Sequence, residues 1–272
     1  MKYRNIVDLH THTDNSFDGN HSAMFLCETA VKKGLRAIAF TDHIEIDFYL
    51  QDHFDRTAAQ SYFEVAKARS AFTGKLTVCK GIELGQPTYD IPTAEELISS
   101  RGYDIVIGSI HNLRDKKDFC YLDYIKDNLD CNELLNTYFD ELLTLSQWGK
   151  FDTMAHLTYP LRYIVGNYGI KIDINDYSEK IDAILENLVK KDRALEINTS
   201  GLRQKLSRTM PDIDIVRRFR ELGGKLITVG SDAHFAEHLG ANIEDGLDIA
   251  KACGFKSVAL FMNRIPTEIP IE

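Results

Sequence analysis

The stretch NIVDLHTH, residues 5–12, is a short apolar run that ends in two histidines, His10 and His12, one residue apart. A run of this kind, rich in β-branched and apolar residues, predicts a buried strand. Because alternate residues of an extended chain point to the same side, both imidazoles are expected to reach one site from the end of this strand.

Six similar runs follow, and they alternate with longer amphipathic stretches along the whole chain. Together with the first, the predicted strands are Asn5–His10, Arg36–Asp42, Leu76–Glu83, Asp104–Ile110, Asp152–His156, Ala194–Asn198 and Lys225–Gly230. Helices are predicted over Ser22–Lys33, Thr57–Phe72, Ile181–Lys191 and Ile213–Leu222. Such alternation implies parallel strands joined by right-handed crossovers. The expected fold is therefore α/β, with seven strands in a closed or nearly closed (β/α) barrel.

Two segments depart from this rhythm. The run Ser257–Phe261 is expected to be either an eighth strand or a strand that closes the bottom of the barrel. The polar, tyrosine-containing insertion Asn112–Asp130 is interpreted as a lid or rim loop, or else as a solvated excursion. No linker or low-complexity tract is apparent, so residues 1–272 are expected to form a single domain.

The amino-acid composition limits the kinds of partner that the protein is expected to bind and the cell compartment in which it is expected to lie. The net charge of −9 argues against binding to nucleic acid, which needs a basic face, although bound cations can still draw a phosphorylated substrate into an acidic cleft. The five cysteines are scattered and form no C-x-x-C pair, as is typical of reduced thiols. The longest apolar runs fall far short of the roughly 18 residues of a membrane span. A soluble, cytoplasmic protein is expected.

Metal-ligand side chains recur at the end of strand after strand. Six of the nine histidines occupy such places, and carboxylates join them. The candidate ligands are His10, His12, Asp18, His43, Glu83, His111, His156, Asp232 and His234. Since all carboxyl ends of the strands in a (β/α) barrel face the same mouth, these side chains are expected to converge. His21, His53 and His238 fall in predicted loops or helices and are interpreted as ordinary residues.

The chemistry of these candidates indicates the kind of metal site. Imidazole and carboxylate ligands without a thiolate suit zinc, iron or manganese. Nine ligands exceed what one tetrahedral ion can use, so two or three ions are expected. Glu83 is the natural bridge, because each oxygen of a carboxylate can bind a different ion.

The ordered motifs resemble a known family. H-T-H at 10–12, T-D-H at 41–43, G-I-E at 81–83, S-I-H at 109–111, M-A-H at 154–156 and S-D-A-H at 231–234 resemble the polymerase-and-histidinol-phosphatase (PHP) superfamily. Within it, G-I-E-L-G, G-S-I-H and E-I-N-T-S-G-L-R are most similar to the histidinol-phosphatase branch. The resemblance implies a distorted (β/α)7 barrel with a trinuclear centre.

The resemblance also implies how the ligands are shared among three divalent ions, Zn, Mn or Fe. The implied sets are His10, His12, Glu83 and Asp232 for the first ion, Glu83, His111 and His156 for the second, and Asp18, His43 and His234 for the third. Asp18 precedes Gly19 and can instead be a turn residue, with Asp14 nearby. The implied reaction is hydrolysis of L-histidinol phosphate to L-histidinol and phosphate in histidine biosynthesis, by a hydroxide that two ions share.

Further candidates lie around these ligands. Asp42 is either an acid for the leaving alcohol or a group that orients His43. Arg162 is the preferred cation for the phosphate and Arg203 the second choice, with a surface ion pair as the alternative for either. Asn198 and Ser200 are expected to bind phosphate or substrate, or simply to cap a turn. Tyr159, Tyr163 and Tyr168 are expected to contact the imidazole and ammonium of the substrate by charge and stacking, or else to be ordinary packing.

Other functions stay open at this point. A broad-specificity PHP phosphoesterase or phosphodiesterase would have nearly the same centre, and an inactive, structural metal-binding module would also retain it. An amidohydrolase also uses H-x-H on a first strand, but the paired Asp232 and His234 fit it poorly. The sequence makes no prediction about the oligomeric state.

Overall fold

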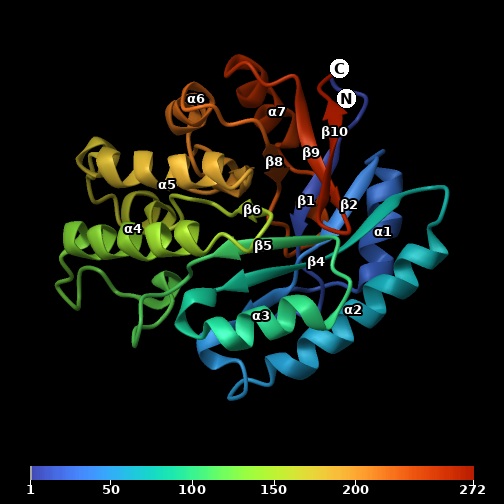
Figure 1. The fold of residues 1–272 in the computed structure, drawn as a ribbon, viewed down its shortest axis with the longest axis horizontal. Coiled ribbons are helices and arrows are strands. Elements are labelled where there is room, and N and C mark those ends of the chain that lie inside the picture. Colours follow the sequence, from blue (N-terminus) through green and yellow to red (C-terminus); the bar gives the residue numbers. More distant parts are fainter. Residues whose placement is uncertain (1) are drawn as a thin grey trace.

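The computed structural model describes residues 2–272, and its centre is a curved sheet of parallel strands (Figure 1). In spatial order the seven strands within the described residues are β1 (Val7–Thr11), β2 (Ala37–Phe40), β4 (Thr77–Gly85), β5 (Ile105–Ser109), β6 (Thr153–Met154), β7 (Ala194–Asn198) and β8 (Ile227–Gly230). A short strand, β3 (His43–Glu45), pairs with the second half of β4. The predicted parallel (β/α) arrangement is confirmed.

The sheet nearly closes on itself between its first and last strands. Beyond the end of β8, Asp232 N donates to His10 O at 2.8 Å, and His12 N donates to Ala233 O at 2.9 Å. Thr11 and Ala233 form a parallel bridge at the same place. The contact joins the two ends of the sheet at the mouth, where the candidate ligands lie.

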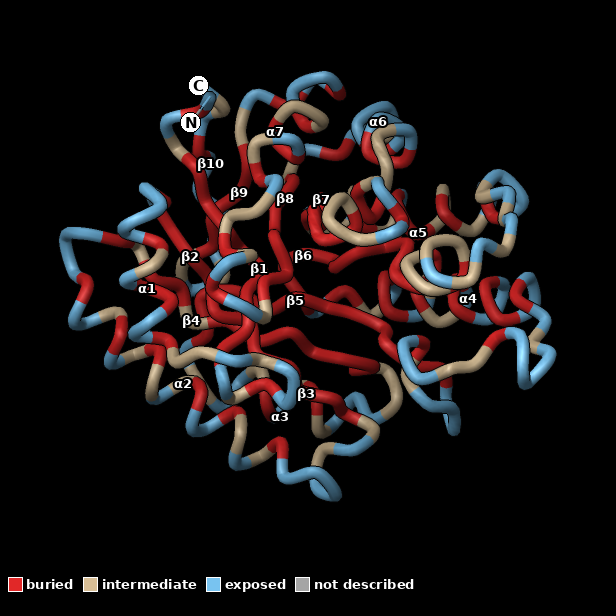
Figure 2. The backbone as a smooth tube through the Cα atoms, turned by 180° about the vertical axis from the view of Figure 1, so that it is seen from behind, coloured by how far each residue is buried: buried red, intermediate tan, exposed pale blue. Residues whose placement is uncertain are grey.

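Helices surround this sheet, and they have one buried face each. Their bounds are α1 (Ala23–Lys32), α2 (Phe54–Ala71), α3 (Ile91–Ser100), α4 (Cys131–Trp148), α5 (Ser178–Lys190), α6 (Ile213–Glu221) and α7 (Ile243–Ala252). Ser22 caps α1 by accepting from Phe25 N, as its position in the sequence predicted. Figure 2 shows buried stretches along the strands and exposed ones mainly on helices and outer loops. None of the helices of residues 2–272 is long and apolar enough to cross a membrane.

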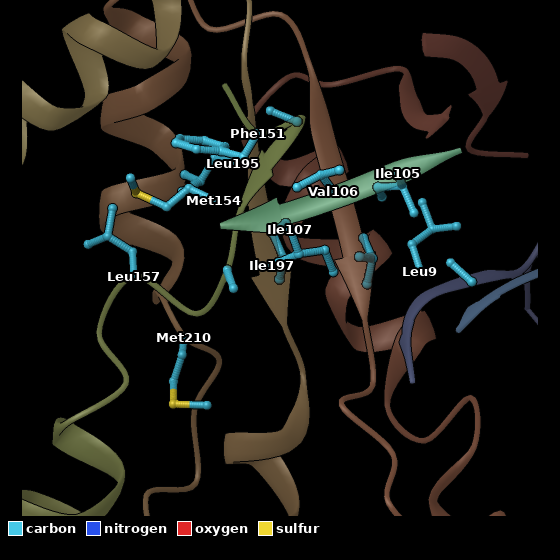
Figure 3. Packing of buried hydrophobic residues seen from close by; sticks show 14 of the residues in the cluster. Leu9, Ile105, Val106, Ile107, Phe151, Met154, Leu157, Leu195, Ile197 and Met210 are labelled. Carbon is cyan, nitrogen blue, oxygen red and sulfur yellow. The ribbon is translucent and has the colours of Figure 1, made fainter. Parts of the chain in front are cut away.

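Apolar side chains on both faces of the strands form the core. In β5, Ile105, Val106 and Ile107 are all buried, because one face meets the barrel interior and the other meets the helices. Leu195 and Ile197 of β7 lie in the same cluster (Figure 3). Burial on both faces explains why these strands appear in the sequence as continuous apolar runs rather than alternating ones.

The C-terminal segment covers the amino-terminal end of the barrel. It forms an antiparallel hairpin of β9 (Ser257–Met262) and β10 (Ile265–Pro270). At its turn, Asn263 N donates to Asp104 Oδ1 at 3.0 Å and Arg264 Nε to Asp152 Oδ2 at 2.9 Å. Asp104 and Asp152 directly precede β5 and β6. The run Ser257–Phe261 is therefore not an eighth barrel strand, because the residues that follow β8 already bond to the end of β1. It is the alternative, a strand across the bottom.

The insertion between β5 and α4 has an ordered fold of its own. Asn112 and Asp118 form an antiparallel bridge, and a 3-10 turn spans Phe119–Tyr121. Phe119 is buried, and its N–H donates to His111 O at 3.0 Å. The insertion is thus tied to a strand end at the mouth, as a rim loop is, rather than being a solvated excursion.

Candidate metal centre

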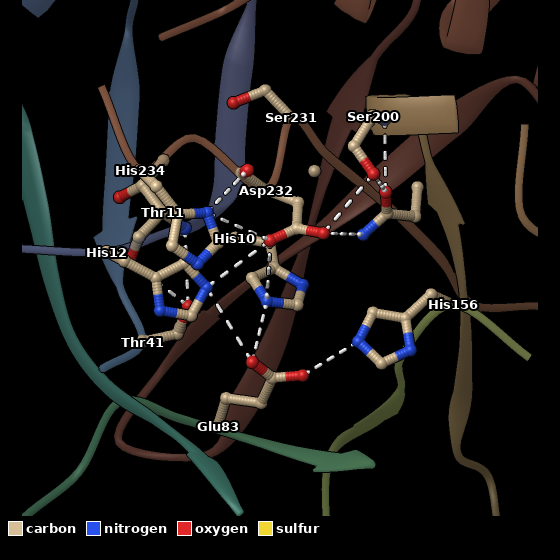
Figure 4. A network of polar contacts seen from close by, with 12 residues as sticks. His10, Thr11, His12, Thr41, Glu83, His156, Ser200, Ser231, Asp232 and His234 are labelled. Carbon is tan, nitrogen blue, oxygen red and sulfur yellow. Dashed lines mark hydrogen bonds and ion pairs between the residues drawn. The ribbon is translucent and has the colours of Figure 1, made fainter. Parts of the chain in front are cut away.

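The carboxylate of Glu83, from β4, lies at the middle of the site and is fully buried. Its Oε2 lies 3.1 Å from His10 Nε2 and 3.6 Å from His12 Nε2. Its Oε1 lies 3.1 Å from His111 Nε2 and 2.8 Å from His156 Nε2. The two oxygens therefore face two different pairs of imidazoles, as a bridging carboxylate requires. Figure 4 shows one oxygen directed to His10 and His12 and the other to His156.

Asp232 completes the group around Glu83 Oε2. It follows β8 with a left-handed backbone (φ 54°), and its Oδ1 lies 3.5 Å from His12 Nε2 and 3.9 Å from His10 Nε2. Figure 4 shows Asp232, His10, His12 and Glu83 pointing toward a common centre. These are the four residues expected to share one ion.

A second group lies nearer the solvent. Asp18 Oδ2 lies 3.1 Å from His234 Nε2, and Asp18 Oδ1 lies 3.8 Å from His43 Nε2. Burial raises the pKa of Asp18, but the hydrogen bond to His234 and the nearby His43 outweigh burial and lower this pKa to about 2. In the described part of the chain Asp14 forms no ion pair with a histidine, so Asp18 is the carboxylate of this group.

His43 connects the two groups. Its Nε2 lies 3.4 Å from His234 Nε2, whereas its Nδ1 lies 3.1 Å from Glu83 Oε2. Three compact sets of donor atoms result, each with all atoms within 4.8 Å: His12, His43 and His234; His10, His12 and Glu83; and His43, Glu83 and His111. The structure thus brings all nine predicted ligands to one mouth.

Unpaired polar atoms show that this cluster suits metal ions. His10 Nε2, His12 Nε2, His43 Nδ1 and Glu83 Oε2 are buried and have no hydrogen-bond partner among residues 2–272. Buried polar atoms are normally paired; the three nitrogens lie 3.1–3.6 Å from Glu83 Oε2 without hydrogen-bond geometry, and a bound cation between them would satisfy them. Imidazole nitrogens and carboxylate oxygens are suitable donors for zinc, manganese or iron.

Charge in the cluster supports the same conclusion. Burial raises the pKa of Glu83, but His10, His111 and His43 outweigh this and hold it well below its usual range. Burial lowers the pKa of His10, yet Glu196 and Glu83 together raise it well above its ordinary value. Burial, together with His234 and His43, instead holds the pKa of His12 well below its ordinary value. A divalent cation that binds this cluster would displace any proton from its ligands.

Glu196, from β7, was not predicted from the sequence. Its Oε1 lies 2.7 Å from His10 Nδ1, and its Oε2 accepts from His156 N at 2.8 Å. A carboxylate in this place fixes the ring so that Nε2 faces the metal side. Gly230 makes room for it, because a Cβ there would lie 2.6 Å from Glu196 Oε1. The sequence feature that could have revealed Glu196 is that it is the single charged residue in the otherwise apolar run Ala194–Ile197.

Glu45, from β3, was also missed. Its Oε1 lies 2.9 Å from His111 Nδ1 and 3.4 Å from His43 Nδ1, so it orients His111 as Glu196 orients His10. A Cβ on Gly85 would lie only 1.9 Å from Glu45 Oε2. Gly85, the last glycine of G-I-E-L-G, is therefore explained by the space that the Glu45 side chain occupies. The available signal was the spacing of His43 and Glu45, two residues apart on one strand.

Asp42 holds a loop rather than facing the centre. Its Oδ1 accepts from Thr13 N at 2.6 Å and from Ser16 Oγ at 2.8 Å, and its Oδ2 accepts from Thr13 Oγ1 at 2.8 Å and Ser61 Oγ at 2.5 Å. Ser16 Oγ also accepts from His43 N at 3.1 Å. Both carboxylate oxygens are engaged, which favours the positioning function over that of an acid.

Arg162 is the cation that lies at the centre. Its Nη2 donates to Asp232 Oδ2 at 2.8 Å and to Ser200 Oγ at 2.5 Å. Ser200 Oγ in turn donates to Asn198 Oδ1 at 2.6 Å, and Asn198 Nδ2 donates to Glu196 Oε2 at 3.1 Å. Asn198 and Ser200 thus form a buried chain of hydrogen bonds that links Arg162 to Glu196, the residue that orients His10.

Arg203 is placed differently. Its Nη2 donates to the backbone oxygens of Ser231 at 2.6 Å and Asp232 at 3.0 Å. Asp8 supports the same loop by accepting from Ser231 N and Gly240 N, both at 2.8 Å. This geometry favours Arg203 as a support for the loop that carries Asp232, so that Arg162 remains the candidate for phosphate.

Tyr159 and Tyr163 lie at the edge of the cluster, whereas Tyr168 packs against Tyr124 of the insertion, with ring centroids 5.1 Å apart. Tyr159 packs its ring against His111 and His156, with centroids 5.2 and 5.0 Å apart, and its hydroxyl donates to Asp118 Oδ1 at 3.0 Å. Tyr163 shares a hydrogen bond with Tyr159. Tyr168 donates to Leu122 O at 3.3 Å. These contacts favour packing around the metal ligands over the expected contact with substrate.

Comparison with known proteins identifies the class. The family model described as the PHP domain matches residues 8–200, which is more than half of the chain. The protein belongs to the PHP domain family.

Within that family, relatives named as histidinol-phosphatases or probable histidinol-phosphatases match over nearly the full length. The chain is 30% identical to a probable histidinol-phosphatase of Clostridium acetobutylicum, covering 93% of this chain and 96% of the relative. It is 29% identical to a probable histidinol-phosphatase of Thermotoga maritima, covering 96% and 98%. The fold matches the crystal structure of histidinol phosphate phosphatase from Lactococcus lactis, complexed with zinc, L-histidinol and phosphate, with a TM-score of 0.79 and 26% identity over 96% of this chain and 98% of that one.

Proposed function

We propose that this protein is a metal-dependent phosphatase that hydrolyses the phosphomonoester of L-histidinol phosphate to L-histidinol and phosphate. The observation that carries the proposal is the convergence of imidazoles and carboxylates on both oxygens of Glu83, with Arg162 beside them. The substrate is inferred from the full-length relatives, among them the Lactococcus lactis protein solved with zinc, L-histidinol and phosphate. The cytoplasmic location expected from the sequence is part of this proposal.

Three divalent ions, Zn, Mn or Fe, fit the donor groups. The proposed sets are His10, His12, Glu83 and Asp232 for the first, Glu83, His111 and His156 for the second, and Asp18, His43 and His234 for the third. His43 would use Nε2 in the third set, because that nitrogen faces Asp18 and His234. When bound, such ions lower the pKa of water and neutralise phosphoryl charge.

The residues of the chain supply orientation. Glu196 and Glu45 hold His10 and His111 with Nε2 toward Glu83. Asp232 and Ser200 hold the guanidinium of Arg162, whose side chain keeps 14% of its surface exposed at the mouth. A guanidinium held in this way is ready to donate to the oxygens of a phosphate ester, and its charge stabilises the additional negative charge of the transition state.

Steady-state kinetics would test the proposal. L-histidinol phosphate is compared with a small panel of phosphomonoesters and phosphodiesters, and the metal content of the same preparation is measured. We expect the highest kcat/KM on L-histidinol phosphate and negligible turnover of diesters. A higher kcat/KM on a diester would point to a phosphodiesterase, and no turnover by protein with full metal content would point to a structural metal-binding module.

A further inference from the structure

A buried glutamine, Gln86, directly follows β4 and belongs to none of the proposed metal sets. Its side chain is fully buried, and its backbone is left-handed with φ 47°, a conformation that residues other than glycine adopt uncommonly. Its N–H donates to Ser109 O at 3.0 Å, which ties the residue to the end of β5. A polar side chain is thus held at full burial between the ends of the strands that precede and follow it.

Both ends of the Gln86 side-chain amide are engaged. Its Oε1 accepts from His111 N at 2.9 Å. Its Nε2 donates to Glu45 Oε2 at 2.9 Å and to Asp47 Oδ1 at 3.2 Å, and also to Asn112 Oδ1. Because one end of the amide faces an N–H and the other faces three oxygens, these partners fix which way the amide points.

Gln86, Glu45 and His111 form a closed ring of hydrogen bonds. Glu45 Oε1 lies 2.9 Å from His111 Nδ1, while Glu45 Oε2 accepts from Gln86. No other hydrogen-bond donor within residues 2–272 reaches Glu45 Oε2. Gln86 therefore restrains His111 in two ways, at the backbone directly and at the imidazole through Glu45.

Asp47 and Asn112 extend this network to the insertion. Asn112 is the first residue of the insertion, and its Nδ2 donates to Asp47 Oδ2 at 2.8 Å. Gln86 donates to both residues. A glutamate in place of Gln86 would turn an oxygen toward the oxygens of three neighbours, and an apolar side chain would leave those oxygens without this donor. The chemistry of the network thus explains why an amide occupies this position.

We propose that Gln86 is a positioning residue for the second proposed ion, the one assigned to Glu83, His111 and His156. The inference rests on the proposed metal centre. Gln86 is not itself a ligand, and it acts through His111, whose Nε2 it keeps directed at Glu83. Without Gln86, Glu45 Oε2 loses its donor and His111 loses both restraints, so this ion should bind more weakly than the other two.

The metal content of two variants, Gln86→Met and Gln86→Glu, tests this role. Each purified protein is equilibrated with increasing concentrations of a chelator, and the ions retained per chain are counted by mass spectrometry, so that no turnover is needed. We expect one ion to leave at a chelator concentration about 10-fold lower than in the wild type, the effect of losing an outer partner of a ligand. The other ions should leave as they do in the wild type.

A double variant identifies the ion that is lost. His156→Ala removes a proposed ligand of the second ion and should release that ion by itself. Adding Gln86→Met to His156→Ala should then release no further ion, because both substitutions act on the same one.

Asn187→Leu is the control for the loss of a part-buried amide, since Asn187 Nδ2 donates to Ser146 Oγ at 2.9 Å between α5 and α4. Its chelator curve should stay within twofold of the wild type. If Gln86→Met does not fold, Gln86→Gly keeps the left-handed backbone without the side chain and gives the same measurement.

A chelator curve of the Gln86 variants within twofold of the wild type, or an equal shift of every ion, would overturn the role of Gln86. Further loss of ions in the double variant would overturn it as well. The outcome for the enzyme as a whole is separate. A wild type that binds the ions but turns over no phosphate ester contradicts the proposed function, whereas the chelator curves still decide the role of Gln86.

Discussion

Glu83 offers one carboxylate oxygen to His10 and His12 and the other to His111 and His156. Glu83→Ala should therefore remove more than one ion, because two donor sets lose their shared member at once. Activity should fall by more than about 100-fold, since loss of even an outer partner of a ligand costs 10–100-fold. Metal analysis of the purified variant by mass spectrometry checks the count.

The matched control is Glu186→Ala, an exposed position on α5. It should retain the metal content and activity of the wild type. Full metal occupancy in Glu83→Ala would show that Glu83 does not bridge.

Arg162 gives a second prediction at this scale. In Arg162→Met, the charge that would face phosphate is lost while every metal ligand remains. We expect KM for the ester to rise and kcat/KM to fall by about 10- to 100-fold, the range for loss of a charged hydrogen bond. Kinetics with metal analysis measure both effects.

Arg217→Met serves as the control, because Arg217 forms an exposed pair with Asp214 on α6. Unchanged kinetics in Arg162→Met would transfer the phosphate contact to Arg203.

At the scale of elements, closure of the barrel depends on how closely β8 approaches β1. A Cβ on Gly230 would lie 2.3 Å from His10 Cβ and 2.6 Å from Glu196 Oε1. Gly230→Ala should push the strands apart and displace His10, which we expect to cost about 1–3 kcal/mol of unfolding free energy. Denaturant unfolding of the metal-free protein measures this cost directly.

Gly102→Ala is the control for backbone effects, since a Cβ there would meet only Tyr62 Oη at 3.5 Å. It should change the free energy of unfolding by less than about 0.5 kcal/mol. If Gly230→Ala is equally mild, β1 and β8 are free to separate and the closure is not tightly packed.

For the whole molecule, the metals and the core contribute separately to stability. The core is an apolar cluster that extends through all seven parallel strands of the described chain, so the metal-free protein should stay folded. A chelator should abolish activity, and Zn²⁺, Mn²⁺ or Fe²⁺ should restore it. Ions that bind only the folded state should raise stability by about 2.7 kcal/mol at one hundred times their dissociation constant.

Circular dichroism and thermal melts with and without metal distinguish these contributions. Activity that survives complete removal of metal would disprove a metal-dependent mechanism. Loss of the circular dichroism signal on chelation would instead show that the cluster, and not the apolar core, holds the strands together.

The sequence by itself determined the parallel barrel and the candidate ligands gathered at its mouth. Burial on both faces makes each strand a continuous apolar run, and strand ends in a parallel barrel share one side, so His10, Glu83 and His156 could be brought together without coordinates. The motifs then supplied the family, which the match over residues 8–200 confirmed. The prediction of Asp18 as a ligand had less support, because no periodicity places a loop residue. Its contact with His234 appears only in the structure.

The tertiary structure alone decided what surrounds the ligands. His10 and Glu196 are 186 residues apart in the chain, and no local pattern reports that their side chains meet. No local pattern reports the contact of Glu45 with His111 or that of Arg203 with the backbone of Ser231. The place of the C-terminal hairpin across the bottom of the barrel is likewise visible only in the structure. Local periodicity encodes which face of an element is buried, whereas the partner across that face depends on how distant elements pack. For that reason the convergence of the candidate ligands was readable from sequence, and the residues that orient them were not.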